Sequence, residues 1–324
     1  MRVAFCENRL TYRGTTDAVY QYADYNETML GNESIIITRK FVPGFVDIDQ
    51  RIYDKFHSRF RVVYYTDPSE IDGIIEREKC DVFYCIKYGF VDGLMTTKCK
   101  NIMHCAGTGF QPHGEFYCAV SECMSKWQGH EYFLPHIVDN LPEVSGDFRE
   151  DLGIPANATV FGRYGGMDVF GPDFIRNVVK DIVNARDDIY FIFMSTPEFY
   201  HHPQIKYFTP QTSREIKAKF IATSDAMFHA RKDGETFGLA IGEFSLKNKP
   251  IVVFKHPPGS NCPTNHYDVL GDNAFYYKDA DELTTIFNTF DRDDAKTKQW
   301  NMYQQFNPTD VMAQFKTLID KAVA

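Results

Sequence analysis

Short apolar segments alternate with amphipathic segments along most of this chain, and the alternation runs twice. The first series predicts strands at residues 3–6, 34–38, 61–65, 81–86, 101–104 and 116–120. The second series predicts strands at residues 159–163, 189–194, 205–208, 226–230, 251–254 and 274–277. Strands that alternate with helices form parallel β-α-β units. The sequence therefore predicts an α/β protein with two Rossmann-like domains.

The boundary between the domains is predicted in residues 134–158, which are rich in proline and glycine and show little periodicity. We expect an N-terminal domain over residues 1–136 and a C-terminal domain over residues 137–300. Residues 301–324 have an amphipathic pattern and predict a separate C-terminal helix, which can pack back on the N-terminal domain. Two such domains account for nearly all of the 324 residues.

Charge and composition exclude several classes of function. The 35 basic and 44 acidic residues give a net charge of −9, which disfavours a nucleic-acid partner. No apolar run reaches the roughly 18 residues that a membrane span needs, and the N-terminus lacks the apolar core of a signal peptide. The eight cysteines contain no C-x-x-C pair, so we expect reduced thiols in a cytoplasmic protein. A zinc site from Cys99, His104 and Cys105 stays open, although its spacing is unusual for zinc.

Ligands of open parallel sheets bind at the carboxyl ends of the strands. In the second domain these positions are residues 162–166, 195–196, 231–235 and 255–259. The first of them is a glycine-rich loop, in which backbone N–H groups and Arg163 could hold a phosphate. Its spacing matches neither common phosphate-binding motif, and a simple tight turn is the alternative.

The segment after the third of these strands carries a more informative pattern. Gly234, Gly238 and Gly242 recur every four residues, which predicts that they lie in a stripe along one face of a helix. We expect another backbone segment or a ligand to approach that face closely. Glu235 and Glu243 flank the stripe, and on a helix they would lie about 80° and about 12 Å apart. We expect them to contact different hydroxyl groups of one extended ligand, with Glu235 held as an anion by the helix start. Ordinary surface charges are the alternative.

This segment resembles a known signature. Glu235 and Glu243, with residues 237–238 and 248–252, are similar to the E-x7-E motif of retaining glycosyltransferases of the GT-B fold, in particular the GT4 family (glycosyltransferase group 1). The resemblance implies two Rossmann-like domains that face each other across a cleft, the first for the acceptor and the second for the nucleotide-sugar donor. Further similar segments follow in the family's order over most of the chain, at residues 13–16, 119–122, 134–139, 161–163 and 274–287.

The resemblance also implies roles for single residues. Glu235 would contact hydroxyls of the donor sugar, and Glu243 would bind the ribose. Arg163 would neutralise the diphosphate, with Gly14 near the same group from the first domain. Gly165 and Gly238 complete the glycine positions of the donor site.

The resemblance leaves two assignments open. His104 would meet the sugar from the first domain, with His113 as the rival and a structural role as the alternative for either. The family usually has a lysine where this chain has Asp168, so the second cation of the diphosphate site must come from elsewhere, and we expect Arg231 or Lys232 to supply it.

The function implied is transfer of a sugar from a UDP- or GDP-sugar to a hydroxyl of a glycan, a lipid-linked or a small-molecule acceptor. The resemblance further implies retention of anomeric configuration and no requirement for a metal. Because Asp168 departs from the pattern, a catalytically weak scaffold that binds a sugar nucleotide or glycan is the first alternative. A sugar-nucleotide epimerase is the second. The sequence leaves the base, the sugar, the acceptor and the oligomeric state undetermined.

Overall fold

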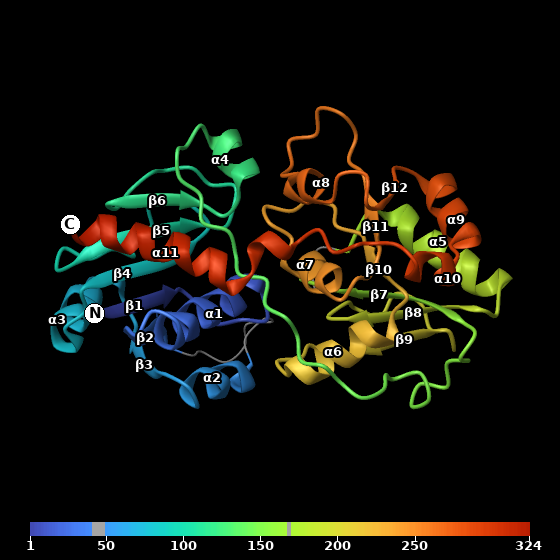
Figure 1. Ribbon diagram of the computed structural model, residues 1–324, viewed down its shortest axis with the longest axis horizontal. Coiled ribbons are helices and arrows are strands. Elements are labelled where there is room, and N and C mark those ends of the chain that lie inside the picture. Colours follow the sequence, from blue (N-terminus) through green and yellow to red (C-terminus); the bar gives the residue numbers. More distant parts are fainter. Residues whose placement is uncertain (41–48, 167–169) are drawn as a thin grey trace. The chain divides into compact units, whose positions relative to one another are not determined.

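The chain forms two compact units (Figure 1), which a computed structural model describes for residues 1–40, 49–166 and 170–324. Unit 1 comprises Met1–Ile137 and Gln305–Ala324, and unit 2 comprises Val138–Gln304. Each unit is built around a six-stranded sheet. No helix in the described ranges is long and apolar enough to cross a membrane.

The sheet of unit 1 is entirely parallel and has the strand order β3-β2-β1-β4-β5-β6. This is the Rossmann order, in which the chain reverses its direction of winding between β1 and β4. Side chains alternate between the two faces of each strand, so that Val3 and Phe5 enter one core while Ala4 and Cys6 enter the other. The strands are β1 (Arg2–Glu7), β2 (Glu33–Arg39), β3 (Arg61–Tyr65), β4 (Val82–Lys87), β5 (Lys100–Cys105) and β6 (Phe116–Ala119).

Helices cover both faces of this sheet. The first face packs against α1 (Gly14–Thr28), α2 (Gln50–His57) and α11 (Pro308–Val323), and the second against α3 (Ile71–Glu78), which follows the short 3-10 helix η1 (Pro68–Glu70). Helix α4 (Glu122–Gln128) follows β6. Helix α11 is the C-terminal segment of the chain, and it places Phe315 against Phe5 of β1, with ring centres 6.0 Å apart. The last helix of the sequence therefore belongs to the core of unit 1.

Unit 2 repeats the same topology with the order β12-β11-β10-β7-β8-β9. Helix α5 shows why its helices form, because Ile175, Val178, Val179, Ile182 and Val183 recur at helical spacing and are all buried. The strands are β7 (Thr159–Tyr164), β8 (Ile189–Met194), β9 (Ile205–Phe208), β10 (Ala226–His229), β11 (Ile251–Phe254) and β12 (Phe275–Tyr277). The helices are α5 (Asp173–Ala185), α6 (Arg214–Thr223), α7 (Leu239–Leu246), α8 (Asn265–Leu270), α9 (Ala280–Thr289) and α10 (Arg292–Lys296), and the 3-10 helix η2 (Gln304–Phe306) follows them.

The prediction of an α/β protein with two Rossmann-like domains is confirmed, but the predicted glycine-striped helix is wrong. Helix α7 begins only at Leu239, and Gly238 precedes it with φ +92°. Gly234 lies in the loop with φ +69°, where a Cβ atom would come 2.1 Å from the carbonyl oxygen of Pro263. Only Gly242 is helical, and a Cβ there would meet Val138 and Tyr303 at 2.9 Å. Two glycines therefore serve backbone conformation, and the third serves close packing within unit 2.

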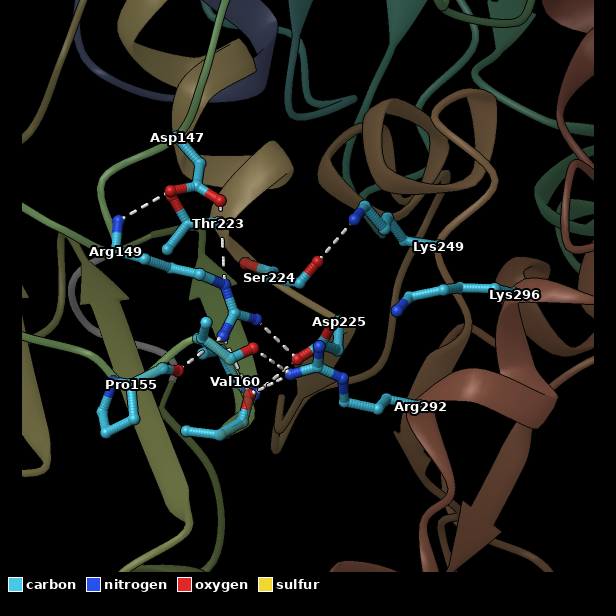
Figure 2. Close-up of polar contacts among 12 residues, drawn as sticks. Asp147, Arg149, Pro155, Val160, Thr223, Ser224, Asp225, Lys249, Arg292 and Lys296 are labelled. Atoms are coloured by element: carbon cyan, nitrogen blue, oxygen red, sulfur yellow. Dashed lines mark hydrogen bonds and ion pairs between the residues drawn. The ribbon is translucent and has the colours of Figure 1, made fainter.

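A charged cluster ties together the amino ends of β7 and β10 (Figure 2). The carboxylate of Asp225 accepts hydrogen bonds from the backbone N–H of Val160 at 2.9 Å and from Arg149 at 2.8 Å. Arg149 and Arg292 both donate to the carbonyl oxygen of Ala158, at 2.8 and 2.6 Å. Lys249 donates to the carbonyl oxygen of Ser224 at 2.6 Å. These bonds fasten surrounding segments to the amino edge of the sheet, the edge opposite the one where ligands of such folds bind.

Candidate functional site

Arg163, near the carboxyl end of β7, is a cation buried in unit 2. Its side chain is only 3% exposed, and its guanidinium carbon lies 4.9 Å from the centre of the Phe170 ring. It donates hydrogen bonds to the hydroxyl of Thr196 and, at 3.4 Å, to the carbonyl oxygen of Gly166. Burial lowers the pKa of Arg163 from 12.5 to about 10, although the negative charge of Glu235 opposes the shift. In the described structure, the fold thus holds a positive charge here whose two hydrogen-bond acceptors are both neutral.

Glu235 lies in the loop between β10 and α7, and two backbone bonds fix that loop. Its N–H donates to Pro263 at 2.9 Å, and its carbonyl oxygen accepts from Asn265 at 3.2 Å. The carboxylate lies 3.0 Å from Nε2 of His229 and 3.1 Å from Nη1 of Arg231. Loop contacts therefore determine the position of Glu235, and the predicted helix start at this residue is wrong.

The charge state of Glu235 follows from these partners. Burial by itself raises the pKa of the carboxyl, but the charge of Arg231 and the hydrogen bond from His229 outweigh burial and lower the pKa to about 2. Glu235 is therefore an anion at neutral pH, which accepts hydrogen bonds and has no proton to donate. This chemistry suits a group that binds hydroxyls.

Two histidines complete the cluster around Glu235. His229 is 5% exposed and His266 is fully buried, and their ring centres are 5.1 Å apart. Within the described part of the chain, Nδ1 of His229 and both ring nitrogens of His266 are buried without a hydrogen-bond partner. Burial lowers the pKa of His229, and it lowers the pKa of His266 strongly, so both rings are neutral at pH 7. Sequence reasoning missed both residues, although His229 ends β10 just before the segment that it singled out.

Glu243 lies near the same carboxyl edge of the unit 2 sheet as Glu235. It lies on α7, is 7% exposed, and accepts a hydrogen bond from the hydroxyl of Tyr164. The ammonium of Lys217 lies 3.7 Å from its other oxygen. Tyr164 follows Arg163 directly in β7, so their side chains leave the strand on opposite faces. The end of β7 therefore carries the hydrogen-bond partner of Glu243 on one face and, on the other, a cation whose pKa responds to the charge of Glu235, and the sequence alone did not reveal the contacts of Tyr164 and Lys217.

The remaining predicted donor residues of unit 2 differ in how closely they join this cluster. A Cβ atom on Gly165 would lie 3.7 Å from Nη2 of Arg163, so the loop follows the guanidinium closely. Gly238 caps α7. Lys232 is exposed and meets this region through its carbonyl oxygen, 2.8 Å from Nε2 of His256. Of the two cations considered for the diphosphate site, Arg231 is the one whose side chain contacts Glu235. Asp168 lies outside the described residues.

Gly14, predicted near the diphosphate, is the first residue of α1 in unit 1. The hydroxyls of the next two residues, Thr15 and Thr16, donate to the carboxylate of Glu7 at 2.5 and 2.6 Å. Glu7 ends β1 and is 7% exposed, and burial raises its pKa to about 7. The N-terminus of a helix is a common anion site, and here a carboxylate of the chain itself occupies the first turn.

Both histidines considered for the sugar belong to unit 1. His104 is fully buried on the sheet, its Nδ1 contacts the hydroxyl of Tyr84, and burial lowers its pKa strongly. His113 is half-buried, with Nδ1 2.5 Å from the carbonyl oxygen of Gln111 and Nε2 3.1 Å from the ammonium of Lys87. Each ring therefore makes contacts within its own unit. Among the described residues, no three His, Cys, Asp or Glu side chains come together in a way that could hold a metal ion.

Comparison with known proteins shows the fold. No protein-family profile matches the chain, and no curated protein matches its sequence. Solved structures match over almost the full length of both chains. HepE from Anabaena, in complex with UDP-glucose, gives a TM-score of 0.74 at 14% identity, over 99% of this chain and 100% of HepE. A glycosyltransferase from Rickettsia africae gives 0.71 at 12% identity, over 99% of this chain and 98% of the other.

A putative UDP-N-acetylglucosamine 2-epimerase from Listeria monocytogenes also matches, with a TM-score of 0.63 at 11% identity, over 99% of this chain and 97% of the other. The chain thus has the fold that GT-B glycosyltransferases share, with two Rossmann-like domains. At these identities the likeness shows the fold alone, so the activity must be argued from the site.

Proposed function

We propose that this protein is a glycosyltransferase that moves a sugar from a UDP- or GDP-sugar to a hydroxyl acceptor. The observation that carries the proposal is the buried charge at the carboxyl edge of the unit 2 sheet. Arg163 is 3% exposed, and it donates hydrogen bonds to a hydroxyl and a carbonyl oxygen, which are both neutral. Burying a cation is unfavourable unless an anion compensates it. A nucleotide diphosphate at this edge would provide the anion, as the UDP-glucose complex of the similarly folded HepE suggests.

The proposed roles follow from the chemistry of each side chain. Arg163 and Arg231 bind the diphosphate and stabilise the negative charge that grows on it as the bond to the sugar breaks. Glu235 is ionised and bonded from one side by His229, so it accepts hydrogen bonds from donor-sugar hydroxyls. Glu243 binds the ribose hydroxyls, and Tyr164 holds its carboxylate in place.

The finer parts of the proposal rest on the resemblance of the motif. They are retention of configuration, independence of a metal, membership of the GT4 family, and a cytoplasmic location. Unit 1 would bind the acceptor, and His104, His113 and Gly14 remain its proposed contacts to the donor. The buried position of His104 and the carboxylate of Glu7 beside Gly14 weigh against direct contacts by these two residues.

A screen of nucleotide sugars tests the proposal. A UDP-, GDP- or ADP-sugar that binds should raise the melting temperature by mass action, and the same donor should then lose its sugar to an acceptor in a panel of glycans, lipid-linked sugars and small alcohols. Glu235→Ala should abolish transfer while the protein stays folded. The proposal fails if no nucleotide sugar stabilises the protein.

The same screen separates the alternatives. The match to a putative epimerase favours a second candidate, a sugar-nucleotide epimerase. Such an enzyme would release an epimerised or free sugar from the donor without any acceptor. A scaffold would bind the nucleotide sugar tightly and turn over neither with nor without an acceptor.

A further inference from the structure

The charges around Glu235 do not balance those of a nucleotide diphosphate. In the described part of this cluster, Arg163 and Arg231 contribute two positive charges and Glu235 one negative charge, which leaves a single net positive charge. The diphosphate of a nucleotide sugar carries two negative charges. A diphosphate that binds beside both arginines would therefore leave one negative charge without compensation in a largely buried site, which is energetically costly.

The two histidines next to Glu235 can supply the missing charge. His229 and His266 are buried with ring centres 5.1 Å apart, and Nδ1 of His229 and both nitrogens of His266 lack hydrogen-bond partners in the described structure. A buried polar atom without a partner is costly and calls for an explanation. A neutral imidazole has one nitrogen that can bind a proton, and a nearby anion makes that proton more stable.

We propose, resting on the function proposed above, that the His229–His266 pair takes up one proton from solvent when a nucleotide diphosphate binds beside Arg163 and Arg231. This proton supplies the second positive charge of the site. The pair is thus part of the diphosphate-binding machinery, although neither ring has to contact the ligand.

The surrounding charges set the direction of the effect. His266 is faced by His229, Glu235, Arg231 and His256, and its ring centre lies 4.2 Å from that of Tyr267. His229 is faced by Glu235, Arg231 and Arg163, and its carbonyl oxygen accepts from the hydroxyl of Tyr277 at 3.2 Å. Without ligand, burial with Arg231 and Arg163 keeps His229 neutral, and burial with His229, His256 and Arg231 keeps His266 neutral, in both cases against the opposing charge of Glu235. A bound diphosphate adds two negative charges to that of Glu235 and favours the protonated pair. Because the complex holds more protons than the free protein, affinity should rise as the pH falls.

Calorimetry measures this proton directly. UDP-glucose and GDP-mannose would be titrated into the full-length protein between about pH 5.5 and pH 8, in pairs of buffers that differ in ionisation enthalpy. The sugar esters are preferred to UDP because its terminal phosphate titrates near pH 6, within that range. We expect uptake approaching one proton, and an affinity that rises by up to about tenfold per pH unit as the pH falls.

Three variants locate the proton. The double variant His229→Asn/His266→Gln, which leaves neither ring to be protonated, should bind the ligand with uptake near zero and with little dependence on pH. His201→Gln is the matched control, because the His201 side chain is 97% exposed beside Glu198 and should leave the uptake unchanged. Glu7→Gln should also leave it unchanged, which excludes Glu7, a buried carboxyl with a pKa of about 7, as the source of the uptake.

The outcomes separate this inference from the function on which it rests. Binding by wild-type protein without proton uptake overturns the inference and leaves the proposed function standing. Uptake that persists in the double variant, or disappears in Glu7→Gln, also overturns it. Binding of neither probe at any pH overturns the proposed donor class and this inference with it. If the double variant does not fold, the wild-type measurement still decides whether a proton is taken up, and unchanged uptake in both His266→Gln and His229→Asn then overturns its location.

Discussion

Replacing Arg163 by glutamine should weaken ligand affinity while leaving the stability of the ligand-free protein nearly unchanged. The pKa of Arg163 falls from 12.5 to about 10 because the guanidinium is buried, and at about 1.4 kcal/mol per unit this corresponds to a cost of about 3 kcal/mol for holding the charge. The folded protein carries this cost throughout the range below the lowered pKa, and therefore at pH 7. Glutamine has no charge and removes it.

The substitution also removes favourable contacts. The hydrogen bond from the charged guanidinium to Thr196 is worth about 2 kcal/mol and the position over the Phe170 ring about 1 kcal/mol more. We therefore expect the free energy of unfolding of the ligand-free protein to stay within about 1 kcal/mol of the wild-type value. A charged hydrogen bond to the diphosphate contributes about 2 kcal/mol, so nucleotide affinity should fall by about 30-fold.

Urea unfolding of the ligand-free protein and calorimetry with the nucleotide sugar selected by the screen measure the two effects. Arg176→Gln is the matched control, because Arg176 also lies over the Phe170 ring, at 5.7 Å, but its side chain is 41% exposed. The control should change stability by less than about 0.5 kcal/mol and leave affinity unaltered. The reasoning is refuted if Arg163→Gln lowers stability by more than about 2 kcal/mol while affinity stays the same, since Arg163 would then be a structural residue.

Three further predictions concern the carboxylates Glu235, Glu7 and Asp225. Glu235→Gln keeps the shape of the site but weakens its hydrogen-bond acceptor, so the rate of transfer should fall by about 100-fold or more in a steady-state assay. A rate near that of wild type would contradict the proposed role of Glu235. The pKa of Glu7 is raised from 4.5 to about 7, so the folded protein binds this proton more tightly than the unfolded chain does. The stability that the proton contributes is fully present below about pH 4.5 and is lost as the pH rises through 7. In urea titrations Glu7→Gln should therefore match wild type near pH 4.5 and exceed it by up to about 3 kcal/mol near pH 8, and an equal difference at both pH values would contradict the burial argument. Asp225→Asn removes the nearer of the two anions beside Arg149 and leaves Asp147 at 3.7 Å, so it should cost up to about 3 kcal/mol in thermal or urea unfolding, whereas the control Asp173→Asn, at a side chain 97% exposed, should cost almost nothing.

The sequence predicted the fold well because the fold depends on patterns of many residues. The ends of each predicted strand match an observed strand to within one or two residues. A buried parallel strand is a short run of apolar residues, and this pattern is easy to recognise in a sequence. The glycine spacing around Glu235 was a weaker signal. Gly234, Gly238 and Gly242 fit a helical period by number alone, but the first two have positive φ angles, and only the backbone shows this.

The site was predicted in part, for a physical reason. Arg231 and Glu235 are close in sequence, and a short loop brings them together, so a motif reveals them. His266 lies near His229 because α8 packs beside the end of β10, and no sequence pattern within either segment predicts this contact. Lys217 reaches Glu243 from another helix in the same way. Contacts between distant segments depend on tertiary packing, which periodicity does not encode.

The two units share one topology, yet their buried charges differ at corresponding places. In unit 1 the turn after β1 ends at a helix whose first hydroxyls bind the carboxylate of Glu7. In unit 2 the turn after β7 follows the buried cation Arg163, and Arg231 lies beside it across Glu235. An anionic ligand would meet a carboxylate at the first position and two guanidinium groups at the second. Assigning the nucleotide diphosphate to unit 2 therefore rests on charge as well as on the resemblance of the motif, and topology alone would have left the two strand ends equivalent.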